Sequence, residues 1–330
     1  MTNWLQRVGA LFGRRRGEPA AVPDLPPSPP HRPAPHAVPQ PVPNGGGAAA
    51  APGPDSAAEL QRRFLEWLIG APLASLMQDS EQRLLEQLDA LTASEHSLAS
   101  LLPRAPAVIP QLLKGLRDQS QSAGALAQRV TRDPNLVVEV IRMANSAQAR
   151  GGAPLTDITE AIQRLGTDGL RRAILRVMLK PIFGGQANSL TARCSQRLWQ
   201  HSEAQAAACL QEASARGLDP FDGYVAGLMH NVGWTAALRA IDLSDIRAPA
   251  QFSLPFMMAV QARRDTLFAL LVTPWQLADT LSALAAELLA GGGEPAASPL
   301  GQALGLADHR ASLQMLGAGG APPNLPPTTA

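Results

Sequence analysis

The sequence predicts an all-α protein, a multi-helix bundle that follows a disordered, proline-rich N-terminal tether. Three observations predict this fold class. Alanine and leucine, which favour helices, dominate a chain that is 45% hydrophobic, and β-branched residues are sparse. Apolar residues recur at helical spacings, and no segment shows the alternation of a strand. Capping residues and prolines mark one helix start after another. The 330 residues suffice for one sizeable core or two small ones.

The N-terminus divides into an amphipathic segment, residues 1–16, and a linker, residues 17–55. The first segment ends in three arginines and carries an apolar stripe made of Trp4, Leu5, Val8, Leu11 and Phe12. We expect either a weak membrane-surface or partner-docking helix, or a frayed terminus without a role. The linker is rich in proline, alanine and glycine and cannot bury enough apolar surface to order itself, so we expect a disordered tether.

Residues 56–100 are expected to form a short helical pre-domain. Ser56 and Glu59 have the spacing of a capping box, and apolar stripes follow in two helices, the second at about 80–91. The pair could serve as a dimerisation or docking element. The simpler expectation is that both helices pack on the main core.

From Leu101 to residue 290 the caps and apolar spacings predict a dense helical domain. Asp133-Pro134 is a typical start, because a capping aspartate precedes a proline at the first helical position. Further expected helices follow the same logic, at 106–117, 122–131, 134–144, 157–166, 167–183, 190–216, 220–230, 252–272, 275–290 and 299–315. The last of these belongs to a C-terminal region, 291–330, which we expect to be a short helix and a flexible tail.

Charge and cysteine content favour a cytoplasmic protein without a demand for a polyanionic partner. The net charge is +1, which argues against nucleic acid as the main partner. Cys194 and Cys209 lie on one expected helix, roughly 22 Å apart at 1.5 Å per residue, so they cannot form an intrachain disulfide. No apolar run approaches the length of a membrane span, and the N-terminus does not have the order of a signal peptide.

Five short motifs occur in sequence between residues 101 and 290. They are LPRAP at 102–106, IRMANS at 141–146, AIQRLG at 161–166, LWQHS at 198–202 and AGLMH at 226–230. In this order they resemble the HDOD family, a helical and catalytically degenerate relative of the HD phosphohydrolases. The resemblance implies an HD-like bundle and assigns structural roles to its motif residues, here Asn145, Ser146, Gly166 and Trp199.

The resemblance also implies a place for a metal site, which histidines and carboxylates form in the HD parent. His201 and His230 stand at two of its positions, but Asn231 stands where the catalytic pattern has aspartate. The stretch 263–277 lacks the usual upstream histidine. Four carboxylates remain as candidates that no motif places, namely Asp242, Asp245, Asp265 and Asp279. Because two imidazoles and an amide hold a hard cation poorly, we expect no metal, no cofactor and no catalytic residue.

Two interpretations of these three residues stay open. His201, His230 and Asn231 form either a vestigial metal or ligand pocket, or a buried polar cluster that hydrogen bonds satisfy. A second candidate site is a row of cations, Arg172, Arg176 and Lys180, at helical spacing. With Gly166 before it, this helix could mimic a helix-turn-helix or meet phosphates, but a solvated helix face is the simpler interpretation.

Three functions follow as expectations. The resemblance implies a non-enzymatic regulatory scaffold in bacterial signalling, which binds an unidentified signalling protein through the bundle. The first alternative is a metal-dependent phosphohydrolase of the HD type. The second is a regulator that binds a cyclic dinucleotide or nucleic acid through the row of cations.

Overall fold

The computed structural model describes residues 57–92, 101, 116, 123–146, 154–275, 279–292 and 295–317. These residues form helices, and they contain no strand beyond an isolated parallel bridge between Ala74 and Ser253. The predicted all-α fold is therefore confirmed. The amphipathic segment, the linker, Ser56 of the first capping box, nearly all of the helix expected at 106–117, and the tail after residue 317 lie outside the described residues.

The helix bounds agree with most of the expected segments. The described helices are α2 (Ala57–Ile69), α3 (Asp79–Thr92), α6 (Ala123–Arg132), α7 (Pro134–Ser146), α8 (Ile158–Leu179), α9 (Leu190–Ala215), α10 (Pro220–His230), α11 (Val232–Leu243), α12 (Leu254–Val272), α13 (Asp279–Ala290) and α14 (Pro299–Met315). Two 3-10 turns join them, η1 (Lys180–Phe183) and η2 (Thr273–Trp275).

Side-chain caps fix several of the helix starts that the sequence predicts. Asp157 accepts a hydrogen bond from the backbone N–H of Glu160 at 2.9 Å, which satisfies a donor that the first turn of α8 leaves unpaired. Asp219 caps α10 in the same way, with Pro220 at the first helical position. These local bonds explain why the helix starts are readable without the tertiary structure.

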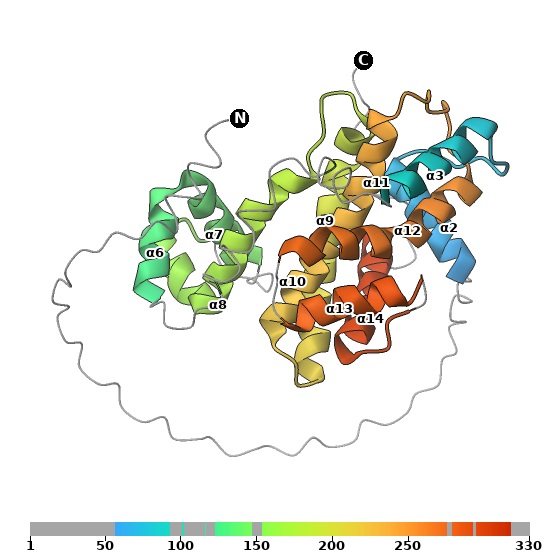
Figure 1. Ribbon diagram of the computed structural model, residues 1–330. Coiled ribbons are helices and arrows are strands. Elements are labelled where there is room, and N and C mark those ends of the chain that lie inside the picture. Colours follow the sequence, from blue (N-terminus) through green and yellow to red (C-terminus); the bar gives the residue numbers. More distant parts are fainter. Residues whose placement is uncertain are drawn as a thin grey trace, which may run out of the picture.

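The helices gather in two groups, which α8 connects (Figure 1). α6, α7 and the first part of α8 form one group, and α9 to α14 form the other with α2 and α3. α8 changes direction at Gly166, whose φ of 61° lies in the left-handed region that favours glycine. The two predicted helices at 157–166 and 167–183 therefore meet at this kink.

α2 and α3 join the main core, as the simpler expectation for this pair proposed. α2 packs against α9 and α12, and α3 packs against α11 and α12. Arg197 of α9 donates to the carbonyl oxygens of Leu68 and Ile69 at 2.7 and 3.0 Å, which satisfies the C-terminal end of α2. Buried leucines of both helices belong to the same hydrophobic cluster as the core of α9 to α14.

The helix α11, Val232–Leu243, was not among the helices predicted from the sequence. Most of its residues are buried, so it lacks the polar face that gives an amphipathic helix its periodicity. Asn231, with φ −72° and ψ 2°, separates it from α10. Its start lies very close to α12, because a Cβ on Gly233 would lie 2.1 Å from the carbonyl oxygen of Arg264.

α9 is the central helix of the larger group, and α10 and α14 pack along it. Two glycines of α10 allow its close approach. A Cβ on Gly223 would lie 2.5 Å from the Cβ of Ala213, and one on Gly227 would lie 2.7 Å from the carbonyl oxygen of Gln205. This contact sets the position of His230 relative to α9. No helix in the described part of the chain is both long and apolar enough to cross a membrane.

The close contact between α9 and α10 predicts opposite effects of one substitution at two helical glycines. Gly227→Ala should lower the free energy of unfolding by about 1–3 kcal/mol, because the added methyl group overlaps the α9 backbone. Gly305→Ala in α14 meets no atom within 4 Å and should be neutral or stabilising by up to about 1 kcal/mol. Urea denaturation of both variants measures this, and equal effects would contradict the proposed contact.

Candidate functional site

The three polar residues of the histidine motifs lie together in the core between α9, α10 and α11. His201 and Asn231 are fully buried and His230 is 2% exposed. The two N–H groups of the Asn231 amide face three acceptors, with Nδ2 at 2.9 Å from Nδ1 of His201, 3.0 Å from Oγ of Ser202 and 3.3 Å from Oε1 of Gln205. Because Nδ1 of His201 accepts, its proton lies on Nε2, which faces Oγ of Ser312 at 3.2 Å.

His230 is held on both ring nitrogens. Nδ1 accepts from Nε2 of Gln205 at 2.8 Å, and Nε2 donates to Oδ1 of Asp265 at 2.9 Å. The ring also meets Phe268 edge-on, with 5.4 Å between centroids. Gln205 therefore joins the two histidines into one network, since its oxygen accepts from Asn231 while its nitrogen donates to His230.

The guanidinium of Arg264 lies between two carboxylates at this site, those of Asp265 and Asp308. Arg264 of α12 donates through Nε to Oδ1 of Asp265 at 2.8 Å, and through Nη1 to Oδ2 of Asp308 on α14 at 2.8 Å. Its side chain is 9% exposed. The other oxygen of Asp308 lies 3.8 Å from Nε2 of His201. Two imidazoles and two carboxylates thus surround a single fixed positive charge.

Burial and the guanidinium set the ionisation of these groups. Burial lowers the pKa of His201 from 6.5 to about 4, although the nearby Asp308 opposes the shift, so the imidazole is neutral near pH 7. Burial alone would raise the pKa of the Asp265 carboxyl, but Arg264 and His230 hold it far below its usual range. Burial likewise opposes the ionisation of Asp308, whose pKa Arg264 nevertheless keeps below its ordinary value.

The four carboxylates that the sequence offered as candidate ligands lie in different places in the structure. Asp265 is the one that reaches the site. Asp242 instead accepts from the backbone N–H groups of Leu190 and Thr191 at 2.7 and 2.9 Å and so caps α9. Asp279 begins α13, and Asp245 follows the end of α11.

Arg264 and Asp308 are site residues that the sequence reasoning missed. Arg264 lies in the stretch 263–277 that was noted for its missing histidine, and its place directly before Asp265 was the available signal. Asp308 and Ser312 belong to α14, beyond the expected domain boundary at residue 290. Their helix nevertheless packs along α9 and completes the site.

These residues do not fit a divalent cation. The described residues contain no group of three or more histidine, cysteine, aspartate or glutamate side chains arranged to hold a metal ion. Both carboxylates already bind the guanidinium, and the ring nitrogens of His230 are engaged by Gln205 and Asp265. Asn231 points its amide nitrogen into the network, whereas its buried oxygen has no hydrogen-bond partner among the described residues.

The row of cations on α8 is divided between the interior and the surface. Arg176 is buried, donates from Nε to Glu139 at 2.5 Å, forms an ion pair with Glu203 and lies over the Trp199 ring. Arg172 is partly buried and lies over Tyr224, 5.9 Å from the ring centroid. Lys180 is exposed. The three cations therefore do not form one exposed stripe.

The remaining motif residues lie in local structural contacts. Asn145 exchanges two hydrogen bonds with the backbone of Leu155, at 2.7 and 3.0 Å, and so ties the end of α7 to the segment before α8. Ser146 donates to the carbonyl oxygen of Arg142 at 2.9 Å. Trp199 packs edge-on against Phe183, with 5.3 Å between centroids. The two cysteines of α9 are buried and free, as expected.

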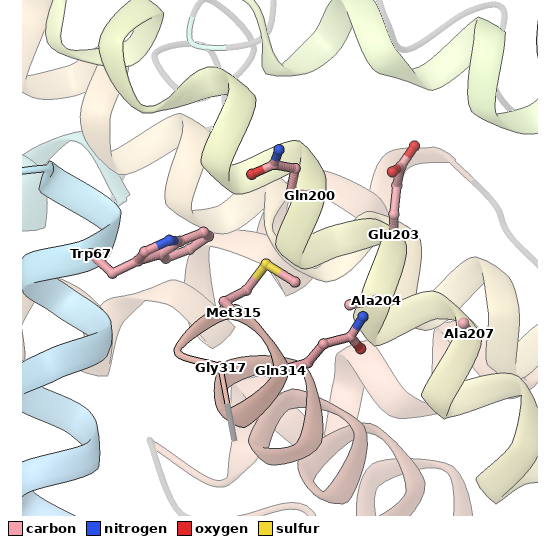
Figure 2. A pocket seen from close by; sticks show the side chains of 8 residues that line it. All are labelled: Trp67, Gln200, Glu203, Ala204, Ala207, Gln314, Met315 and Gly317. Carbon is pink, nitrogen blue, oxygen red and sulfur yellow. The ribbon is translucent and has the colours of Figure 1, made fainter. Parts of the chain in front are cut away.

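Two hollows border α14. The larger, about 590 Å³, is the α9–α14 groove, which is lined by Trp67, Gln200, Glu203, Ala204, Ala207, Gln314, Met315 and Gly317. Figure 2 shows Trp67 of α2 on one side, α9 on the other, and Met315 between them. The second, about 450 Å³, is the only one of the two that reaches the polar site, through His230, Arg264 and Asp265.

Comparison with known proteins finds similarity to a domain family and to solved helical structures. The HDOD domain model matches residues 102–287. A solved structure of a putative metal-dependent phosphohydrolase from Shewanella amazonensis SB2B has a TM-score of 0.50 at 20% identity, over 72% of this chain and 83% of that chain. An HDOD domain protein with unknown function from Geobacter sulfurreducens has a TM-score of 0.49 at 22% identity, over 73% and 83% of the two chains.

Among curated proteins, an uncharacterized protein of Treponema pallidum (strain Nichols) is 24% identical over 149 residues. The match covers 44% of this chain and spans 28% of that protein's own length. At 20% identity the likeness to the Shewanella amazonensis structure concerns the fold alone.

The shifted pKa of His201 predicts a stability that falls as the solution becomes acidic. The pKa of the His201 ring is 6.5 in the unfolded chain and about 4 in the folded chain. Between these two pH values the unfolded chain therefore binds a proton at this ring that the folded chain does not bind. The stabilisation is complete above pH 6.5 and is lost as the pH falls. Between pH 7 and pH 5 the free energy of unfolding should drop by about 2 kcal/mol through this residue.

Urea denaturation at both pH values measures this drop in the wild type and in His201→Gln. The variant should lose that part of the pH dependence, because glutamine does not titrate. His309→Gln, which changes an exposed histidine of α14, is the control and should retain the wild-type dependence. Identical pH dependence in the wild type and in His201→Gln would refute the assignment.

Proposed function

The chain belongs to the HDOD domain family, and from this premise we propose that it is a non-enzymatic regulatory protein of the bacterial cytoplasm, which binds a signalling partner through its helical bundle. The resemblance to the family supports a role in signalling. In this proposal the linker of residues 17–55 connects the bundle to whatever residues 1–16 contact, and so raises its local concentration there.

The position of the Arg264 guanidinium between Asp265 and Asp308 is the observation that supports a function without catalysis. Hydrolysis by an HD-type site needs a cation that lowers the pKa of a bound water molecule. Here Asp265 and Asp308 bind Arg264, and Asn231 supplies amide protons where an anionic oxygen is needed. The two carboxylates that would bind the cation therefore bind Arg264 instead.

The two alternative functions have less support. The name of the Shewanella amazonensis protein suggests metal-dependent hydrolysis for that protein, but its likeness to this chain concerns the fold. Cyclic-dinucleotide or nucleic-acid binding would need several exposed cations in one place. Arg176 is buried and forms ion pairs with Glu139 and Glu203, so Lys180 is the exposed member of the row.

The α9–α14 groove is the surface that we propose for the partner protein. It contains Trp67 and Met315, two residue types that are enriched at protein interfaces, with amide groups at its sides. Ala207 is exposed in the groove and Ala204 is partly exposed, so a partner can approach the α9 backbone closely there.

A hydrolysis assay tests the non-enzymatic part. The full chain, supplied in turn with Mn²⁺, Fe²⁺ and Mg²⁺, should hydrolyse bis-p-nitrophenyl phosphate no faster than the double variant His201→Gln, His230→Gln. Release of p-nitrophenol measures the rate. Turnover that depends on an added ion and disappears in the double variant would contradict the proposal and favour the phosphohydrolase.

Site-specific photo-crosslinking in cells tests the binding part. A photoreactive amino acid at Ala207 should give a discrete crosslinked product, whereas the same amino acid at the exposed Gln128 of α6 should not. The additional change Ala204→Glu should abolish the product, because it places a charge in the groove. Immunoblotting detects the product, and an equal pattern from both positions would count against the groove.

A further inference from the structure

We infer that the guanidinium of Arg264 is a built-in replacement for a metal ion, which occupies the place of a divalent cation between Asp265 and Asp308. The site combines imidazole and carboxylate groups, the types of side chain that bind metal ions, with a cation that is part of the chain itself. This inference concerns the charge of the site and holds whether or not the α9–α14 groove binds a partner.

The order of contacts supports the replacement. Nε2 of His230 meets Oδ1 of Asp265 at 2.9 Å, and the same oxygen accepts from Nε of Arg264 at 2.8 Å. On the other side, Nη1 of Arg264 donates to Asp308 at 2.8 Å, and Asp308 lies 3.8 Å from Nε2 of His201. Each carboxylate thus stands between the guanidinium and one imidazole.

The charges of the site require a cation at this position. The side chains of Asp265 and Asp308 are 28% and 19% exposed, and partly buried carboxylates that share one partner stay ionised because a positive charge compensates them. Arginine is permanently charged, and its planar group offers separate donors to two acceptors. A divalent ion bound by carboxylate oxygens and imidazole nitrogens would fulfil the same electrostatic need, as such ligand sets do for Mn²⁺, Fe²⁺ and Zn²⁺.

The packing of α11 fixes the backbone that carries Arg264, and the two carboxylates fix its guanidinium. α12 carries both Arg264 and Asp265, and α11 approaches it so closely at Gly233 that a Cβ there would lie 2.1 Å from the carbonyl oxygen of Arg264. The hollow of about 450 Å³ that reaches Arg264 and Asp265 offers a route from solvent. Asp265 and Arg264 line this hollow, so we expect an ion to reach Asp265 from it, and Asp308 once the guanidinium between the two carboxylates is removed.

The inference predicts that removing the guanidinium creates a metal site. The full-length wild type, Arg264→Ala and the triple variant Arg264→Ala, Asp265→Asn, Asp308→Asn are freed of metal with a chelator and titrated with MnCl₂. Arg264→Ala should melt below the wild type without metal, gain thermal stability with Mn²⁺, and bind Mn²⁺ more tightly than the wild type by about tenfold or more. Calorimetric titration measures the affinity, and the triple variant should lose the gain.

A folded Arg264→Ala that gains no more from Mn²⁺ than the wild type would overturn the inference, as would a wild type that binds Mn²⁺ equally well. If Arg264→Ala does not fold without metal, the triple variant decides. Its neutral side chains need no cation, so it should fold in the chelator, which supports the charge role. A triple variant as unfolded as Arg264→Ala, with no recovery of the single variant in Mn²⁺, would show that Arg264 acts through packing and would overturn the inference.

Discussion

The ion pairs of Arg264 with Asp265 and Asp308 are the interaction on which the polar core depends. They join α12 to α14, and through the two carboxylates they reach the histidines of α9 and α10. Removal of either carboxylate would leave the buried guanidinium of Arg264 only partly compensated, which is unfavourable even though Asp265 and Asp308 are themselves partly exposed. The three charged residues therefore stabilise the structure together, and none of them can be replaced without affecting the other two.

The α9 helix gives this unit its geometry. Glycines of α10 let the two backbones approach closely, and the bend at Asn231 turns the chain so that its amide faces α9. Gln205 then connects both histidines through its two amide atoms. Because every one of these contacts joins different helices, the hydrogen bonds that satisfy the polar groups also fix how α9, α10 and α11 pack together.

A site whose charges are balanced from within has a different use from one that recruits an ion. Its groups bind each other, and in the function proposed above they contribute to the stability and shape of the bundle. The surfaces around it, including the α9–α14 groove, remain available for recognition. This division is consistent with membership of the HDOD domain family and with the proposal that the chain acts by binding. Proteins that share a fold can differ in function, because function depends on the residues of the site.

The sequence by itself determined the helical fold class and most helix bounds, because caps and apolar spacing are local signals. That His201, His230 and Asn231 belong together was implied by the family resemblance of the short motifs, and the structure brings the three side chains into one network. It did not indicate α11, which is buried too completely to show a periodic face. Only the tertiary structure decided that Arg264 and Asp308 complete the site and that Arg176 is internal. Apart from the pair of neighbours Arg264 and Asp265, the hydrogen bonds of the site join residues 25 to 111 positions apart, and no local pattern encodes which groups meet across that distance.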